Sequence, residues 1–131
     1  MARSESEHPT ELELDILKIL WVESPLQVRD VRERLEKAGR KLAHSTVITM
    51  LNIMHRKGYL RRKTDAKAFL FAPKVDKDRV TGGMMRDLMS RAFDGSPKAL
   101  VLNLLNTAEL DAEELAELRK LISRKAKEQQ S

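Results

Sequence analysis

The 131-residue chain has no cysteine and few aromatic residues. Without cysteine it can build neither a disulfide framework nor a thiolate metal site, which agrees with a reducing cytoplasm. Aromatics make up only 4% of the residues, so a core must be built from Leu, Ile, Val and Met. No stretch approaches the roughly 18 consecutive apolar residues of a membrane span, and the opening MARSESEHPTELELD lacks the apolar region of a signal peptide. We therefore expect a cytoplasmic protein with no membrane partner.

The residue groupings that catalysis and metal binding require are also missing. No nucleophile stands with an adjacent base, and Gly82-Gly83 lacks the context of a phosphate-binding loop. His8, His44 and His55 do not have the spacing of metal ligands. We expect no enzyme activity, no metal site and no cofactor.

Positive charge is concentrated in one part of the chain. Residues 24–74 contain 13 Lys and Arg against 4 Asp and Glu, a net charge of +9, whereas the remainder holds 12 against 16, a net charge of −4. A concentrated positive field of this kind is typical of proteins that bind a polyanion, most often nucleic acid.

Apolar periodicity predicts three helices in the first half of the chain. The first follows a capping box of Thr10 and Glu13 and runs to Trp21 or Val22; the second spans 26–38 and ends at Gly39. The third begins near His44 or Ser45, whose hydroxyl can cap it, and ends at 57–58. The expected core positions are Leu12, Ile16, Ile19 and Leu20, then Val28, Val31 and Leu35, then Val47, Met50, Leu51 and Met54.

Two short runs after the third helix predict a β-hairpin. YLRRKT and KAFLFAP are separated by Asp65-Ala66, and Pro73 ends the second strand. We expect Leu60, Phe69 and Phe71 to face the core. The hairpin carries several Lys and Arg, so it is strongly basic.

Three further helices are expected beyond Pro73. The first spans about 76–93 despite Gly82-Gly83, the second has Ser96 as its cap and Pro97 at its first position, and the last follows a capping box of Asp111 and Glu114. We expect a DNA-binding domain at residues 1–74 and a helical dimerisation domain at residues 75–131.

The order of three helices and a basic two-stranded hairpin is that of a winged helix-turn-helix domain. We expect a mostly α fold with a small β-wing, whose third helix enters the major groove while the hairpin contacts the backbone. Thr46 could instead serve only the helix start. A protein-interaction adaptor without specific DNA binding is the alternative function. The expected DNA-binding residues are Arg40, Lys41, His44, Ser45, Thr46, Thr49, Asn52, Arg56, Arg62, Lys63 and Lys67.

The segments PTELELDILKILW, VRDVRERL, HSTVITMLNIMHRKGYLRR and AFLFAP resemble the penicillinase-repressor family of winged-helix regulators, the BlaI/MecI/CopY group. The resemblance covers nearly the whole chain. It implies a homodimeric transcriptional repressor that binds a palindromic double-stranded DNA operator and dimerises through its C-terminal helices. The C-terminal region also has more apolar helical faces than it can bury alone. The expected dimer-interface residues are Val80, Met84, Leu88, Leu100, Leu104, Leu115, Leu118 and Ile122.

The same resemblance implies routes by which repression is released. In the antibiotic-sensing branch a protease cuts an Asn-Phe bond in the dimerisation region, and the matching bond here is Asn103-Leu104, which lacks the aromatic residue. A sensor or protease partner would supply that cut. The copper-sensing branch uses a cysteine motif in its tail, which this chain does not have. Cleavage, a small ligand and competition by a partner remain as alternatives.

Overall fold

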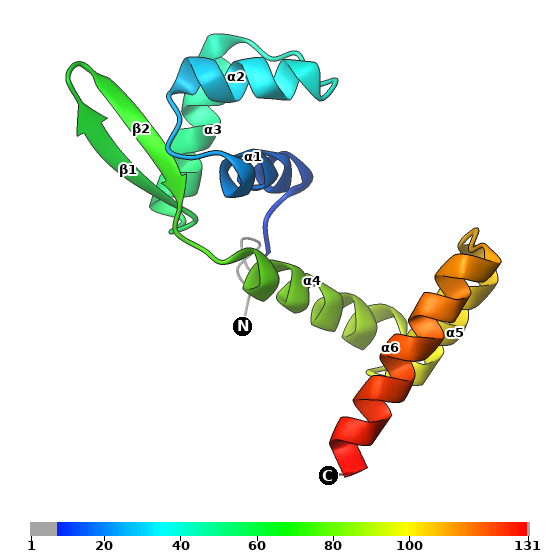
Figure 1. Cartoon of the computed structure of the whole chain (residues 1–131). Helices are drawn as coiled ribbons and strands as arrows, with labels where there is room; N and C mark the ends of the chain where they lie inside the picture. Colours follow the sequence, from blue (N-terminus) through cyan, green and yellow to red (C-terminus); the bar gives the residue numbers. More distant parts are fainter. Residues whose placement is uncertain (1–7, 131) are drawn as a thin grey trace. The chain divides into compact units, whose positions relative to one another are not determined.

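The computed structural model describes residues 8–130 and confirms a mostly helical fold with a two-stranded wing (Figure 1). The described residues form two compact units, which divide between Met85 and Arg86. In order, the elements are α1 (Glu11–Val22), α2 (Val28–Lys37), α3 (His44–Arg56), β1 (Leu60–Asp65), β2 (Ala68–Pro73), α4 (Lys77–Ala92), α5 (Pro97–Thr107) and α6 (Ala112–Gln130). The division between the units falls inside α4.

The predicted capping box starts α1. The Glu13 amide donates to Thr10 Oγ1 at 3.2 Å, and the Thr10 amide donates to Glu13 Oε1 at 2.8 Å. This reciprocal pair satisfies two of the amides that a helix start leaves without partners. The helix ends at Val22, as predicted.

The prediction for α2 was wrong at its start. Leu26 does not belong to the helix, because its backbone forms an antiparallel bridge to Phe71 with hydrogen bonds of 3.0 and 2.8 Å. Gln27 therefore becomes the N-cap, and its amide donates to Asp30 Oδ2. Gly39 closes the helix with a φ of 93°, a left-handed conformation that favours glycine.

The third helix begins at His44, as predicted, but not through the expected Ser45 cap. Ala43 is the N-cap residue and no side chain caps the helix start. Ser45 is the second residue of the helix and is exposed. At the other end Gly58 adopts a φ of 88°, and the Tyr59 amide donates back to the Met54 carbonyl at 2.9 Å.

The core of the first unit lies among α1, α2, α3 and the base of the wing. All three helices contribute the faces expected from periodicity, although Leu12, Ile19, Val28 and Met50 are only partly buried. Leu17 and Leu26 join the core beyond those faces. The buried apolar residues are Ile16, Leu17, Leu20, Leu26, Val31, Leu35, Val47, Leu51, Met54, Tyr59, Leu60 and Phe71.

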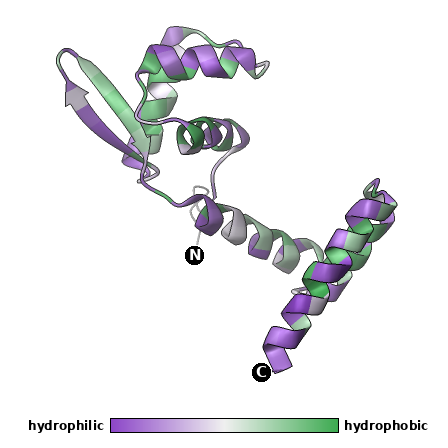
Figure 2. Cartoon of the chain, viewed as in Figure 1, coloured by the Kyte–Doolittle hydropathy of each residue, from purple (hydrophilic) through white to green (hydrophobic). Residues whose placement is uncertain are grey.

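The wing is an antiparallel hairpin whose two strands differ sharply in hydropathy, β1 being polar and β2 apolar (Figure 2). Its turn lies at residues 66–67, one position later than predicted, and Ala66 adopts a φ of 55°. The prediction that Phe69 faces the core was wrong. It shares the face of buried Phe71 but lies two residues nearer the turn, beyond the packed core, and is 45% exposed.

The helices beyond the wing begin as the sequence indicates. Ser96 Oγ accepts from the Ala99 amide at 3.1 Å with Pro97 at the first helical position, and Asp111 Oδ1 accepts from the Glu114 amide at 2.8 Å. Helix α4 continues through Gly82-Gly83. None of these helices contains a buried residue within the part of the chain that the structure describes.

Candidate nucleic-acid interface

Helix α3 presents a polar, exposed face opposite its buried one. Ser45, Thr46 and Thr49 are exposed near its start, and Arg56 is exposed in its last turn. Val47, Leu51 and Met54 hold the other face in the core with no exposed area. The helix is thus fixed by packing while short hydroxyl side chains, which can reach base edges, point to solvent.

A groove of about 350 Å³ runs between this helix, the start of α2 and the second wing strand. Its cationic or titratable lining residues are Arg29, His44 and Lys67, and no carboxylate lines it. Apolar side chains form much of the remaining surface. The lining residues are Gln27, Val28, Arg29, His44, Ile48, Asn52, Lys67, Ala68, Phe69 and Phe71. A groove with cations and without acidic groups suits a sugar-phosphate strand.

One wing arginine links the hairpin to the third helix. Arg62 Nη1 donates to Asn52 Oδ1 at 3.1 Å, and the Arg62 guanidinium lies over the Phe69 ring at 4.6 Å from the centroid. Phe69 in turn meets Phe71 edge-to-face with ring centroids 6.4 Å apart. A chain of contacts therefore joins the core to the exposed side of α3.

The cationic residues of the wing lie on both faces of the hairpin and at its turn. In the strand register Arg62 pairs with Phe71, on the face of the hairpin that carries the core residues. Lys63 pairs with Leu70, so it lies on the opposite face. Lys67 lies in the turn. The wing can therefore present charge to a polyanion on both faces and at its tip.

The structure gives Arg40 close partners that the sequence did not indicate. Its guanidinium lies 2.9 Å from Asp15 Oδ2 and 3.4 Å from Glu11 Oε1, both on α1. These carboxylates partly neutralise Arg40, whereas neighbouring Lys41 is exposed. The assignment of both residues to a DNA contact stays a prediction.

The sequence reasoning missed several residues of this surface. Arg29 and Ile48 line the groove, and Arg61 is exposed on the wing. The alternation of side chains along β1 was enough to identify Arg61, and the outward position of Arg29 on α2 was also visible in the sequence. The role of Ile48 depends on how close β2 comes to α3, which only the fold shows.

A buried ionic contact anchors the junction between α3 and the wing. Glu13 is 1% exposed, and its Oε2 lies 2.8 Å from Lys57 Nζ at the C-cap of α3. Next to Lys57 and Gly58, burial raises the pKa of the Tyr59 hydroxyl above its ordinary value, and the negative charge of Glu13 adds to the effect. The contact ties the start of α1 to the end of α3.

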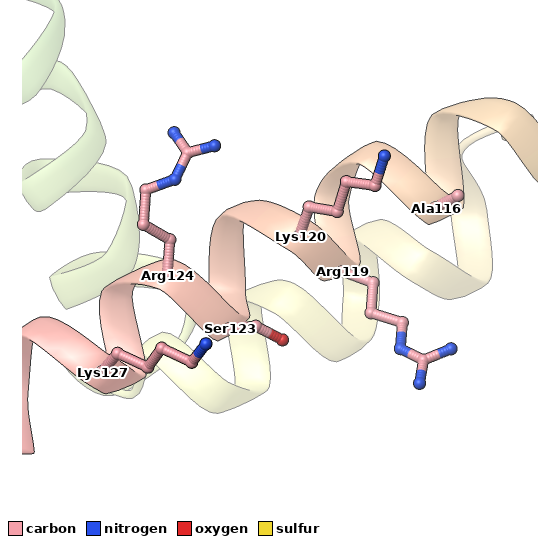
Figure 3. A pocket seen from close by; sticks show the side chains of 6 residues that line it. All are labelled: Ala116, Arg119, Lys120, Ser123, Arg124 and Lys127. Atoms are coloured by element: carbon pink, nitrogen blue, oxygen red, sulfur yellow. The ribbon is translucent and has the colours of Figure 1, made fainter.

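A second basic surface lies on α6 (Figure 3). It consists of Arg119, Lys120, Arg124 and Lys127 with Ala116 and Ser123 between them. In Figure 3 the long side chains point in different directions and do not converge on one point, so they form a solvated face and not a ligand site. Among residues 8–130, no three His, Asp or Glu side chains could together hold a metal ion. In the same range, no helix is both long and apolar enough to span a membrane.

Comparison with known proteins identifies the family. The model of the penicillinase repressor family matches residues 9–124, most of the chain. The chain belongs to the penicillinase repressor family. It is 26% identical to the penicillinase repressor of Bacillus licheniformis over 86% of this chain and 88% of that protein. It is 31% identical to the transcriptional regulator BlaI of Mycobacterium tuberculosis over 86% and 81% of the two chains.

Solved structures show the same fold at lower identity. RosR of H. salinarum superposes with a TM-score of 0.53 at 16% identity. The superposition covers 93% of the present chain and 97% of RosR. The YusO protein of Bacillus subtilis superposes with a TM-score of 0.51 at 20% identity, covering 91% and 75%. At these identities the similarity concerns the fold alone.

Proposed function

We propose that this chain is a homodimeric repressor of a palindromic DNA operator. As a member of the penicillinase repressor family it is a DNA-binding transcriptional repressor. The observation that carries the finer proposal is the exposed polar face of α3 beside a basic wing and an acid-free groove. This arrangement offers base-reading and phosphate-binding groups on one side of the first unit.

Within this proposal the two elements have different roles. Helix α3 enters the major groove, where its short polar side chains contact base edges. The wing, the loop before α3 and the last turn of α3 contact the phosphates, which supply affinity without sequence preference. We assign base contacts to His44, Ser45, Thr46 and Thr49, and backbone contacts to Arg40, Lys41, Arg56, Lys63 and Lys67. Asn52 and Arg62, which contact each other, also bind the DNA.

The exposed apolar residues beyond the wing support a dimer. Leu88, Leu104 and Leu115 are 42–48% exposed, and Ile122 is 61% exposed. Apolar surface of this extent on helices with no buried residue is unusual for a region that stays alone in water. We propose that the second copy covers Val80, Met84, Leu88, Leu100, Leu104, Leu115, Leu118 and Ile122. A two-fold dimer then places two reading helices on two half-sites.

We place the start of the dimerisation region at residue 75. Helix α4 would then belong to it. The boundary between the two compact units falls at residues 85–86, however, so the first part of α4 lies in the unit that contains the wing. We also propose that the protein acts in the cytoplasm, where its operator DNA lies.

Release by proteolysis requires local opening of α5. Asn103 and Leu104 are exposed but lie inside the helix, and Thr107 Oγ1 donates to the Asn103 carbonyl at 2.7 Å. A protease partner needs an extended substrate, so the helix must unwind before Asn103-Leu104 can be cut. Cleavage there would divide the proposed interface.

Fluorescence anisotropy with DNA from upstream of the protein's own gene tests the proposal. Thr49→Ala should lower the preference for the operator over random DNA, because a base contact is lost. Lys63→Ala should weaken binding to all sequences and reduce the salt dependence of binding by about one ion. Equal affinity of the wild type for operator candidates and random DNA would refute a specific repressor. No salt-sensitive DNA binding at all would favour a protein-interaction adaptor.

A further inference from the structure

The contact between Arg62 and Asn52 joins the wing to the reading helix by a side-chain hydrogen bond of 3.1 Å. We propose that these two residues act as one recognition unit that offers only hydrogen-bond donors to the DNA. The unit would select an acceptor-only partner, which is either the O6 and N7 edge of guanine or a phosphate group. The inference rests on the proposed function and deepens it, because it concerns which partner this surface prefers.

The chemistry of arginine fixes the orientation of the Asn52 amide. A guanidinium has five N–H donors and no acceptor, so the Asn52 atom beside it must be the carbonyl oxygen. The Asn52 NH₂ group is then the part that is directed away from Arg62. Asparagine reads adenine by accepting from N6 and donating to N7 at the same time. With its oxygen engaged by Arg62, Asn52 is poorly prepared for that pairing.

Two aromatic rings hold the guanidinium in this position before DNA arrives. Phe69 lies under Arg62 at 4.6 Å, and buried Phe71 supports Phe69 from the core side. A planar guanidinium that stacks on a ring loses less freedom on binding than a free lysine does. Phe69 is therefore a positioning residue for Arg62, which explains an exposed aromatic side chain beside the groove.

The residues that line the groove suit a partner that carries hydrogen-bond acceptors. Asn52 and Phe69 both line it, together with Arg29 and Lys67 and without any carboxylate. Arginine on guanine O6 and N7 is the commonest specific contact in the major groove, and an added amide donor matches the same edge. A phosphate presents the same acceptor-only chemistry, so the experiment must separate the two sources.

A double-mutant cycle on the full-length protein tests the unit. The affinities of wild type, Asn52→Ala, Arg62→Ala and the double variant are measured by anisotropy on an operator obtained by fragment selection. Each single change should weaken binding about tenfold, because it disables a shared contact. The double variant should be no more than about twofold weaker than the worse single variant, whereas independent contacts would give about a hundredfold loss.

Matched variants separate this coupling from general loss of charge. Lys63 neighbours Arg62 on the same strand but lies on the opposite face, so Lys63→Ala should combine additively with Asn52→Ala. Phe69→Leu should reproduce part of the Arg62→Ala loss, whereas Phe69→Tyr, which keeps the ring, should restore binding. Phe69→Leu should have little further effect when Arg62 is already alanine.

Modified DNA identifies the acceptor. Guanine analogues that lack the N7 acceptor are placed one at a time in the operator, and single phosphates are replaced by neutral methylphosphonates in a second set. If Arg62→Ala no longer weakens binding to the operator that carries one guanine analogue, the unit contacts that guanine. If Arg62→Ala no longer weakens binding to the operator that carries one methylphosphonate, the unit contacts that phosphate.

If the losses of affinity caused by Asn52→Ala and Arg62→Ala multiply in the double variant, the two residues act independently and the proposed unit is overturned. The repressor function would stand, because the wild type would still select its operator. The proposal would also be overturned if replacing an adenine in the operator abolished the effect of Asn52→Ala on binding. A wild type that selects no sequence would instead refute the proposed function, and this inference with it.

Discussion

Replacing Lys57 by Met tests whether the buried ionic contact holds α3 to α1. The Glu13 carboxylate is 1% exposed and accepts from the Lys57 ammonium and from the Thr10 amide, each at 2.8 Å. Without the ammonium, the charged carboxylate keeps only one of these hydrogen bonds inside the protein. A buried charge that loses its partner is strongly destabilising.

The expected magnitude follows from the exposure of the two partners. Removal of one member of a fully buried pair costs about 3–5 kcal/mol, but the Lys57 side chain is 28% exposed, so solvent already screens part of the interaction. We expect Lys57→Met to lower the free energy of unfolding by about 2–3 kcal/mol. For a unit of this size the loss corresponds to a fall in Tm on the order of 10 °C.

Urea unfolding at fixed protein concentration measures the effect, with Glu13→Gln and the double variant as controls. Because Gln carries no charge, the double variant should be about 1 kcal/mol more stable than Lys57→Met alone. A Lys57→Met loss below about 0.5 kcal/mol, or a double variant whose loss equals the sum of the single losses, would refute the explanation.

Three further predictions concern the titration of one side chain, one turn and the dimer. Burial raises the pKa of Tyr59, the only tyrosine, above its ordinary value, so ultraviolet titration of tyrosinate should show a higher midpoint in the folded than in the unfolded chain. Above pH 10 the unfolded state then releases this proton first, so stability should fall as pH rises, and Tyr59→Phe should lessen the fall. Gly58→Ala should cost about 1–2 kcal/mol in urea unfolding, since its φ of 88° suits glycine and no neighbouring atom would clash; an unchanged midpoint would contradict this. Leu115→Asp with Ile122→Asp should convert the proposed dimer to monomers in sedimentation and weaken operator binding, whereas a persistent dimer would exclude these residues from the interface.

The sequence predicted those parts of the fold whose signals are local. The Thr10 and Glu13 capping box, the Gly39 and Gly58 helix ends and the buried face of α3 depend on residues within a turn or two of one another. The start of α2 was misplaced because Leu26 is held by Phe71, a strand residue far along the chain. Such pairing is invisible to a window of neighbouring residues.

The candidate site shows the same division. Exposure of Ser45, Thr49 and Arg56 followed from helical periodicity alone, because they lie opposite the buried face of the helix. The contacts of Arg62 with Asn52 and Phe69 could not be predicted, because alternation places Phe69 and Phe71 on one face without showing where the core ends. The capping pattern also does not indicate the burial of Glu13 or its ionic contact with Lys57.

A selection of genomic DNA fragments by the purified protein tests the central claim most directly. The account predicts one enriched consensus with two-fold symmetry, whose half-sites lie about one helical turn apart, because a dimer presents two copies of α3. Bound fragments without a shared motif, or with a single half-site and no symmetry, would contradict a dimeric operator-binding repressor.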